Sequence, residues 1–144
     1  MSNNPSSASA ATHERVARLA QPVPLASLSW IALRTISATR LIAVCARSGR
    51  DPLVELTRRL GDVTTARVFL HFANLVGAYW PEDVQVMRPC CCVLSPDEMT
   101  LALMADCAAA GRREDFSTVL EGFVRTDRHE ELYDRTAVMI AHLQ

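Results

Sequence analysis

Residues 88–98 read RPCCCVLSPDE, and this stretch separates two groups of apolar, helix-like runs. Its second half places Ser95 before Pro96, with Asp97 and Glu98 next in the chain. Serine at the N-cap, proline at the first helical position and carboxylates in the first turn are typical of a helix start. The first half contains three of the five cysteines. The stretch therefore predicts an irregular crossover that leads directly into a helix.

On both sides of this crossover, apolar residues recur at three- and four-residue spacing, as they do in amphipathic helices. Proline and glycine interrupt these runs and mark their ends. The predicted helices cover residues 27–47, 52–60, 62–80, 95–110, 113–123 and 127–144. We therefore expect an all-α protein, a compact bundle of about five to six helices with an irregular crossover at 81–94.

The domain organisation follows from length and composition. Residues 1–24 are rich in Ser, Ala and Pro and are predicted to be disordered or partly helical, with a short helix at 12–20. Residues 25–144 are predicted to form a single helical-bundle domain, because this length suits one hydrophobic core.

Three predictions concern packing within the bundle. The run 62–80 is the most apolar and is expected to be the central helix. On the helix 27–47, four polar residues are expected on the exposed surface: Arg34, Thr35, Ser37 and Arg40. The last helix is expected to open with a capping box formed by Asp127 and Glu130.

Composition excludes several classes of function. The chain has a net charge of −1 and is 49% hydrophobic, as a globular protein is. All fifteen basic residues are arginine, so a Schiff-base lysine and a P-loop lysine are both excluded. No apolar run approaches the roughly 20 residues that span a bilayer. A secretory signal is also lacking, so we expect a cytoplasmic protein with reduced cysteines.

The triplet Cys90, Cys91 and Cys92 admits several roles. In an extended backbone, Cys90 and Cys92 point the same way and together offer two thiolates to a metal such as zinc. A closed zinc site needs four ligands, and the additional ligands considered are His71, His129, Cys45 or a second subunit.

The other interpretations of the triplet are a reactive thiol, a vicinal disulfide or redox switch, and small side chains buried in a tight crossover. Cys92 lies near a helix N-terminus and close to Arg88, which lowers a thiol pKa, but Asp97 and Glu98 oppose this effect. Burial is typical of free cysteine and is the prediction for Cys45 and Cys107.

The motif Pro89-Cys90-Cys91-Cys92, followed by a capped Ser-Pro-Asp-Glu helix, resembles a small uncharacterised bacterial family, a domain of unknown function. The resemblance extends over residues 30–143. No activity is assigned to that family, so the resemblance implies no catalytic or binding residue.

Two further sequence patterns each allow more than one interpretation. The polar residues of the run 62–80 form one stripe, which is either a solvated edge or the lining of a pocket or dimer seam: Thr64, Arg67, His71 and Asn74. The segments 52–60 and 62–80 are joined by Gly61, which is the order of a helix-turn-helix DNA-binding motif, with Arg58, Arg59 and Arg67 near the turn. The apolar character of the second helix speaks against insertion into a DNA groove.

The sequence favours a small interaction or regulatory protein without catalytic activity. None of the catalytic motifs that place histidine beside a carboxylate or a nucleophile occurs. Four aromatic residues exceed the needs of one small core and predict a homodimer: Trp30, Phe72, Tyr79 and Trp80. The alternative function is a thiol-based metal or redox sensor that uses the cysteine triplet, and the third is a helix-turn-helix DNA binder.

Overall fold

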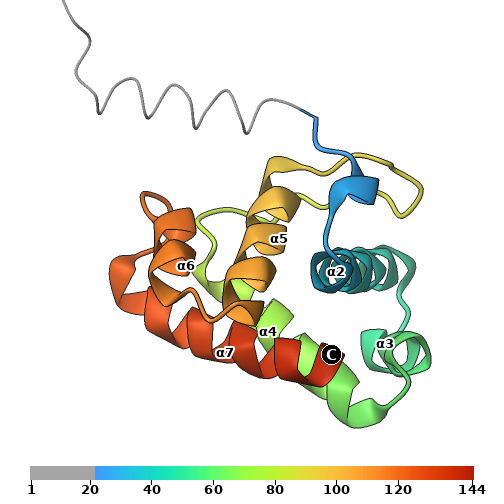
Figure 1. Cartoon of the computed structure of the whole chain (residues 1–144). Coiled ribbons are helices and arrows are strands. Elements are labelled where there is room, and N and C mark those ends of the chain that lie inside the picture. Colours follow the sequence, from blue (N-terminus) through green and yellow to red (C-terminus); the bar gives the residue numbers. More distant parts are fainter. Residues whose placement is uncertain (1–21) are drawn as a thin grey trace, which may run out of the picture.

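The computed structural model describes residues 22–144, and this part of the chain is all-α, as predicted (Figure 1). The predicted helix at 12–20 lies outside the described residues. In the described part, six α-helices and two short 3-10 helices follow one another: η1 (Leu25–Ser27), α2 (Trp30–Ser48), α3 (Pro52–Leu60), α4 (Val63–Tyr79), α5 (Pro96–Ala109), α6 (Arg113–Leu120), η2 (Thr126–Arg128) and α7 (His129–Leu143). Residues 81–95 form the predicted irregular crossover.

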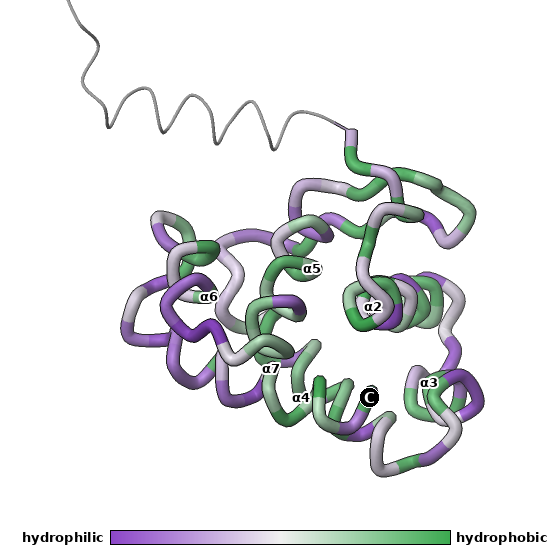
Figure 2. Tube along the Cα trace, in the orientation of Figure 1, coloured by the Kyte–Doolittle hydropathy of each residue, from purple (hydrophilic) through white to green (hydrophobic). Residues whose placement is uncertain are grey.

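The helix at the centre of the bundle is α5, which contacts α2, α6 and α7 (Figure 1). The prediction that the run 62–80 would be central was wrong, since α4 packs mainly on α3 and α7. The small side chains of Ala102 and Ala105 are buried and let neighbouring helices approach α5 closely. By contrast, Val63 at the start of α4 is 43% exposed. Figure 2 shows that much of α5 is hydrophobic and that the outer side of α3 is hydrophilic.

Side-chain caps fix where most helices begin. Ser29 accepts from the Ala32 N–H at 3.1 Å, and Asp51 accepts from the Leu53 N–H at 2.9 Å. Ser95 caps α5, and the Glu98 side chain accepts from the Ser95 N–H at 2.9 Å, which completes a capping box. The caps at Asp51 and Ser95 confirm two predicted helix starts, because each satisfies N–H groups that lack a partner within the helix. The predicted start of α2 at Ser27 was wrong, since residues 25–27 form η1 and Ser29 is the N-cap.

The predicted cap of the last helix was wrong. The 3-10 turn η2 runs directly into α7, and Arg128 before α7 has helical rather than extended backbone angles. The residue at an N-cap position normally has extended backbone angles, which Arg128 lacks. Asp127 lies inside η2 and does not cap α7. Its carboxylate instead pairs with Arg125 at 2.8 Å.

Two predicted surface positions of α2 are buried. Thr35 is fully buried, and its hydroxyl donates to the Ile31 carbonyl at 2.9 Å, which satisfies the polar atom within the helix. Arg40 is only 3% exposed.

Two of the aromatic residues expected at a subunit seam belong to the core instead. Phe72 and Trp80 are both buried, and the Trp80 indole packs edge-on against Phe123 with ring centroids 5.0 Å apart. The indole N–H donates to Asp97 at 3.2 Å. Two of the four remain: Trp30 is 69% exposed and Tyr79 is half-buried. Among residues 22–144, none of the helices is long and apolar enough to cross a membrane.

The Asp62 cap of α4 predicts a pH-dependent contribution to stability. Hydrogen bonds, first from the Thr65 hydroxyl and then from backbone N–H groups, hold the pKa of Asp62 below its ordinary value. A lowered folded-state pKa stabilises the protein above the unfolded pKa of about 4, and the effect is lost as pH falls through the folded value.

We therefore expect Asp62→Ala to lower the urea midpoint at pH 7, and the gap to wild type to narrow below about pH 4. Asp83→Ala, which removes an exposed carboxylate in the crossover, is the control. An Asp62→Ala deficit that stays constant from pH 7 to pH 3 would contradict the prediction.

Candidate functional site

The cysteine triplet lies in a turn rather than in an extended strand. The Cys91 N–H donates to the Arg88 carbonyl at 2.9 Å, which closes a β-turn over residues 88–91. Pro89 occupies the second position of this turn, where its fixed φ is favoured. The expectation of an extended backbone through the triplet is therefore wrong at its first residues, and residues 88–93 are named here the cysteine loop.

Residues 23–25, which lead into η1, hold the far end of the cysteine loop. The Leu25 N–H donates to the Cys92 carbonyl at 2.8 Å, and the Leu94 N–H donates to the Val23 carbonyl at 2.9 Å. Pro24 and Val93 form an isolated antiparallel bridge. Residues 23 and 24 thus belong to the fold, although the sequence placed them in the N-terminal segment.

Arg40 of α2 reaches across to the cysteine loop and to α5. Its Nε donates to Glu98 Oε2 at 2.7 Å, and one Nη donates to Glu98 Oε1 at 3.1 Å. The remaining N–H groups reach three loop carbonyls: Arg88 at 3.3 Å, Cys91 at 2.7 Å and Val93 at 2.9 Å. A guanidinium has five N–H donors, so each donor of this buried cation has an acceptor.

Glu98 completes this arrangement from α5. The carboxylate is fully buried, and it serves both the capping box at Ser95 and the ion pair with Arg40. The hydrogen bond to Glu98 raises the pKa of Arg40 above its ordinary value, so the guanidinium stays charged. The pair joins α2, the cysteine loop and α5, and we call it the Arg40–Glu98 clamp.

One sequence pattern indicates that Arg40 faces the core, although its charge suggests an exposed position. Ala32 and Ile36 precede Arg40 at steps of four, so Arg40 continues an apolar row on α2. Glu98 gave no such signal, because a capping box already accounts for glutamate at that position.

The three thiols of the cysteine loop differ in their exposure to solvent. Cys90 and Cys92 are exposed and Cys91 is half-buried, whereas Cys45 and Cys107 are buried as predicted. Burial raises the pKa of the Cys107 thiol. The interpretation of the triplet as buried packing residues is therefore wrong for Cys90 and Cys92.

The proposed extra metal ligands are not gathered around the triplet. Within residues 22–144, no group of three or more His, Cys, Asp or Glu side chains lies close enough to hold a metal ion. His129 is buried, with its Nε2 2.9 Å from the Val124 carbonyl. His71 is exposed on α4 with the rest of its stripe, which is Thr64, Arg67 and Asn74. A solvated edge is the interpretation that this exposure supports.

Removal of one partner of the clamp is expected to destabilise the protein strongly. Arg40→Met leaves the buried Glu98 carboxylate without its cation, which costs about 3–5 kcal/mol in comparable buried pairs. The double variant Arg40→Met/Glu98→Gln leaves no buried charge, and glutamine still completes a capping box, so it should lose less than Arg40→Met alone.

Urea unfolding of the single and double variants measures this difference. Arg47→Met, at an exposed position on the same helix, is the control and should change stability by no more than about 0.5 kcal/mol. A double variant that is less stable than Arg40→Met would contradict the clamp as the source of the loss.

Comparisons with protein-family models, with curated proteins and with solved structures found no match to this chain. The resemblance of the Pro-Cys-Cys-Cys motif to an uncharacterised bacterial family therefore stays a prediction.

Proposed function

We propose that this protein is a small, non-catalytic regulatory module whose cysteine loop is a thiol redox switch. The observation that carries the proposal is the exposure of Cys90 and Cys92 on a loop whose backbone is held by the buried Arg40. Free cysteine is among the most buried residue types, and Cys45 and Cys107 follow that rule. Two exposed thiols on an anchored loop are open to oxidants in a way that core thiols are not.

Disulfide geometry selects the pair that would react. Adjacent cysteines have Cα atoms 3.8 Å apart across a trans peptide, whereas disulfides usually need about 4.4–6.8 Å. Residues two apart in sequence reach that range, which favours Cys90 with Cys92 over either pair that includes Cys91. Cys91 is also the half-buried member, and its carbonyl is bound by Arg40.

The switch has a defined chemistry with a peroxide as the oxidant. The thiolate of one exposed cysteine attacks the peroxide O–O bond and becomes a sulfenic acid, and the peroxide is reduced to water or an alcohol. The second thiol then attacks the sulfenic sulfur, the S–S bond forms and water leaves. A cellular dithiol reverses the step by exchange, with its own oxidation to a disulfide. We propose the reducing cytoplasm as the site of action, where the dithiol is the resting state.

Oxidation would alter the clamp. A Cys90–Cys92 bridge fixes the side chains on both sides of Cys91, whose carbonyl accepts from Arg40 at 2.7 Å. Because Arg40 also binds Glu98, a change in the loop backbone would be transmitted to α2 and to the start of α5. This coupling is the physical basis for a regulatory role.

The geometry gives less support to the other functions. A catalytic role for His129 is disfavoured because the side chain is buried, with Nε2 2.9 Å from the Val124 carbonyl. A zinc centre at the triplet would need a donor from outside the described residues, since these gather no group of three potential ligands. DNA binding through α4 is disfavoured because Phe69 and Phe72 face the core, which leaves little more than the first turn for base contacts.

The proposal is tested by mild hydrogen peroxide treatment of the reduced full-length protein, followed by mass spectrometry. We expect one disulfide that links Cys90 to Cys92, with Cys45 and Cys107 still free, and full recovery of thiols with dithiothreitol. Cys91→Ser is the matched control and should still form the bridge, whereas Cys90→Ser and Cys92→Ser should not. Triplet thiols that react only after denaturation, or a bridge that requires Cys91, would contradict the switch.

A further inference from the structure

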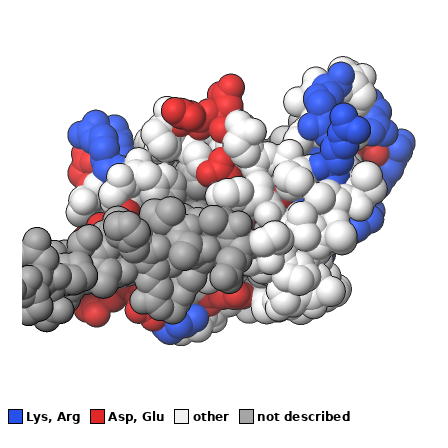
Figure 3. All heavy atoms as spheres, turned by 90° about the horizontal axis from the view of Figure 1, so that it is seen from above, with Lys and Arg blue, Asp and Glu red and all other residues white. Residues whose placement is uncertain are grey.

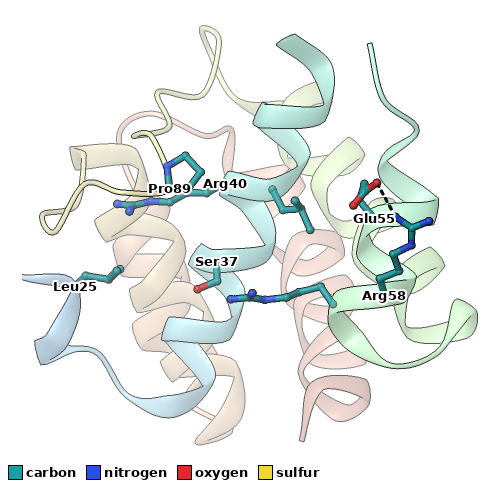
Figure 4. Close-up of a pocket in the computed structure, with 8 residues that line it drawn as sticks. Leu25, Ser37, Arg40, Glu55, Arg58 and Pro89 are labelled. Atoms are coloured by element: carbon teal, nitrogen blue, oxygen red, sulfur yellow. Dashed lines mark hydrogen bonds and ion pairs between the residues drawn. The ribbon is translucent and has the colours of Figure 1, made fainter. Parts of the chain in front are cut away.

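A groove runs between α2 and α3 and reaches the cysteine loop (Figure 4). It consists of two hollows with volumes of about 400 Å³ and about 360 Å³, and both are lined by Ser37 and Arg59, so they adjoin. Figure 4 shows Leu25 and Pro89 on one side of the larger hollow, Glu55 and Arg58 on the other, and Ser37 between them. We call this surface the α2–α3 groove.

The charge along the α2–α3 groove is mainly positive. Arg58 and Arg59 are exposed in the last turn of α3. Figure 3 shows a cluster of basic side chains at one end of the molecule. Glu55 pairs with Arg58 at 3.4 Å, but Arg58 is 73% exposed, and exposed pairs of this kind are weak. The ion pairs of residues 22–144 do not include Arg59. Two guanidinium groups are thus available to anionic groups.

The floor and ends of the groove are apolar. Trp30 lines the smaller hollow and is 69% exposed, the largest exposure among the big hydrophobic residues of the described chain. Leu41, Leu25 and Pro89 line the larger hollow. Tryptophan and arginine are enriched among the residues that contribute most of the binding energy at protein interfaces, and both line this groove.

We infer that the α2–α3 groove docks an acidic, amphipathic peptide segment of a protein partner. Carboxylates of the peptide would form charge-assisted hydrogen bonds with Arg58 and Arg59, and its apolar side chains would cover Trp30 and Leu41. Charge complementarity selects this occupant, because the groove offers cations beside apolar surface.

Two other occupants fit less well. Single-stranded nucleic acid binds on successive aromatic platforms in a strongly basic channel, and here Glu55 lines the wall beside a single exposed tryptophan. A second copy of this chain would have to bring an acidic, apolar segment to the groove.

The groove also touches the proposed switch. Pro89 and Arg40 line its larger hollow, and Pro89 directly precedes Cys90 in the turn. Peptide binding in the reduced protein does not rest on the proposed function. Only a dependence of that binding on the oxidation state rests on it, so the two ideas fail separately.

Selection of a random peptide library displayed on phage against the reduced full-length protein tests the inference. We expect enriched peptides to be acidic with interspersed large apolar residues, and their binding to weaken as salt rises. Arg59→Glu and Trp30→Ala should each weaken binding of a selected peptide by at least about tenfold. Arg112→Glu is the matched control, because Arg112 is an exposed arginine with a carboxylate three residues away, outside the groove.

A charge swap separates recognition from misfolding. Replacement of the glutamates of the selected peptide by lysine should restore binding to Arg59→Glu while abolishing binding to wild type. The inference is overturned if no peptide is enriched, if enriched peptides are not acidic, or if groove substitutions leave binding unchanged. It is also overturned if oligo-dT binds more tightly than any selected peptide, or if light scattering shows a dimer that Arg59→Glu dissociates.

Discussion

Arg40 donates five hydrogen bonds from one buried guanidinium, and the position of the cysteine loop depends on them. A buried cation is tolerated only when it is paired and its remaining donors are satisfied, and Glu98 with three loop carbonyls meets both conditions. The same interaction joins α2 to the start of α5, which is the central helix of the bundle. An irregular segment thereby gains a fixed place between two helices.

Local signals in the sequence were sufficient for most of the fold. Helix starts at Asp51, Asp62 and Ser95 were predictable because each cap is a hydrogen bond between near neighbours in the chain. The clamp was not predictable, because Arg40 and Glu98 are 58 residues apart and only the folded bundle brings them together.

The candidate site was predicted in part. The triplet was identified from composition, but its exposure depends on the turn at residues 88–91 and on the clamp, which periodicity does not reveal. The α2–α3 groove was missed altogether, since it arises where two helices meet and no single run of sequence encodes it. Its arginines were considered only as contacts for DNA. The loop and the groove share Pro89 and Arg40, so one buried cation serves both surfaces.

The most direct measurement of the central claim is nitrogen-edited proton NMR of the arginine side chains. If Arg40 is held as the structure shows, its guanidinium protons should give separate signals that exchange slowly with solvent, with nuclear Overhauser contacts to Cys91 and Val93. The exposed arginines of α3 should exchange fast under the same conditions. A fast-exchanging, averaged Arg40 signal without contacts to the cysteine loop would contradict the account.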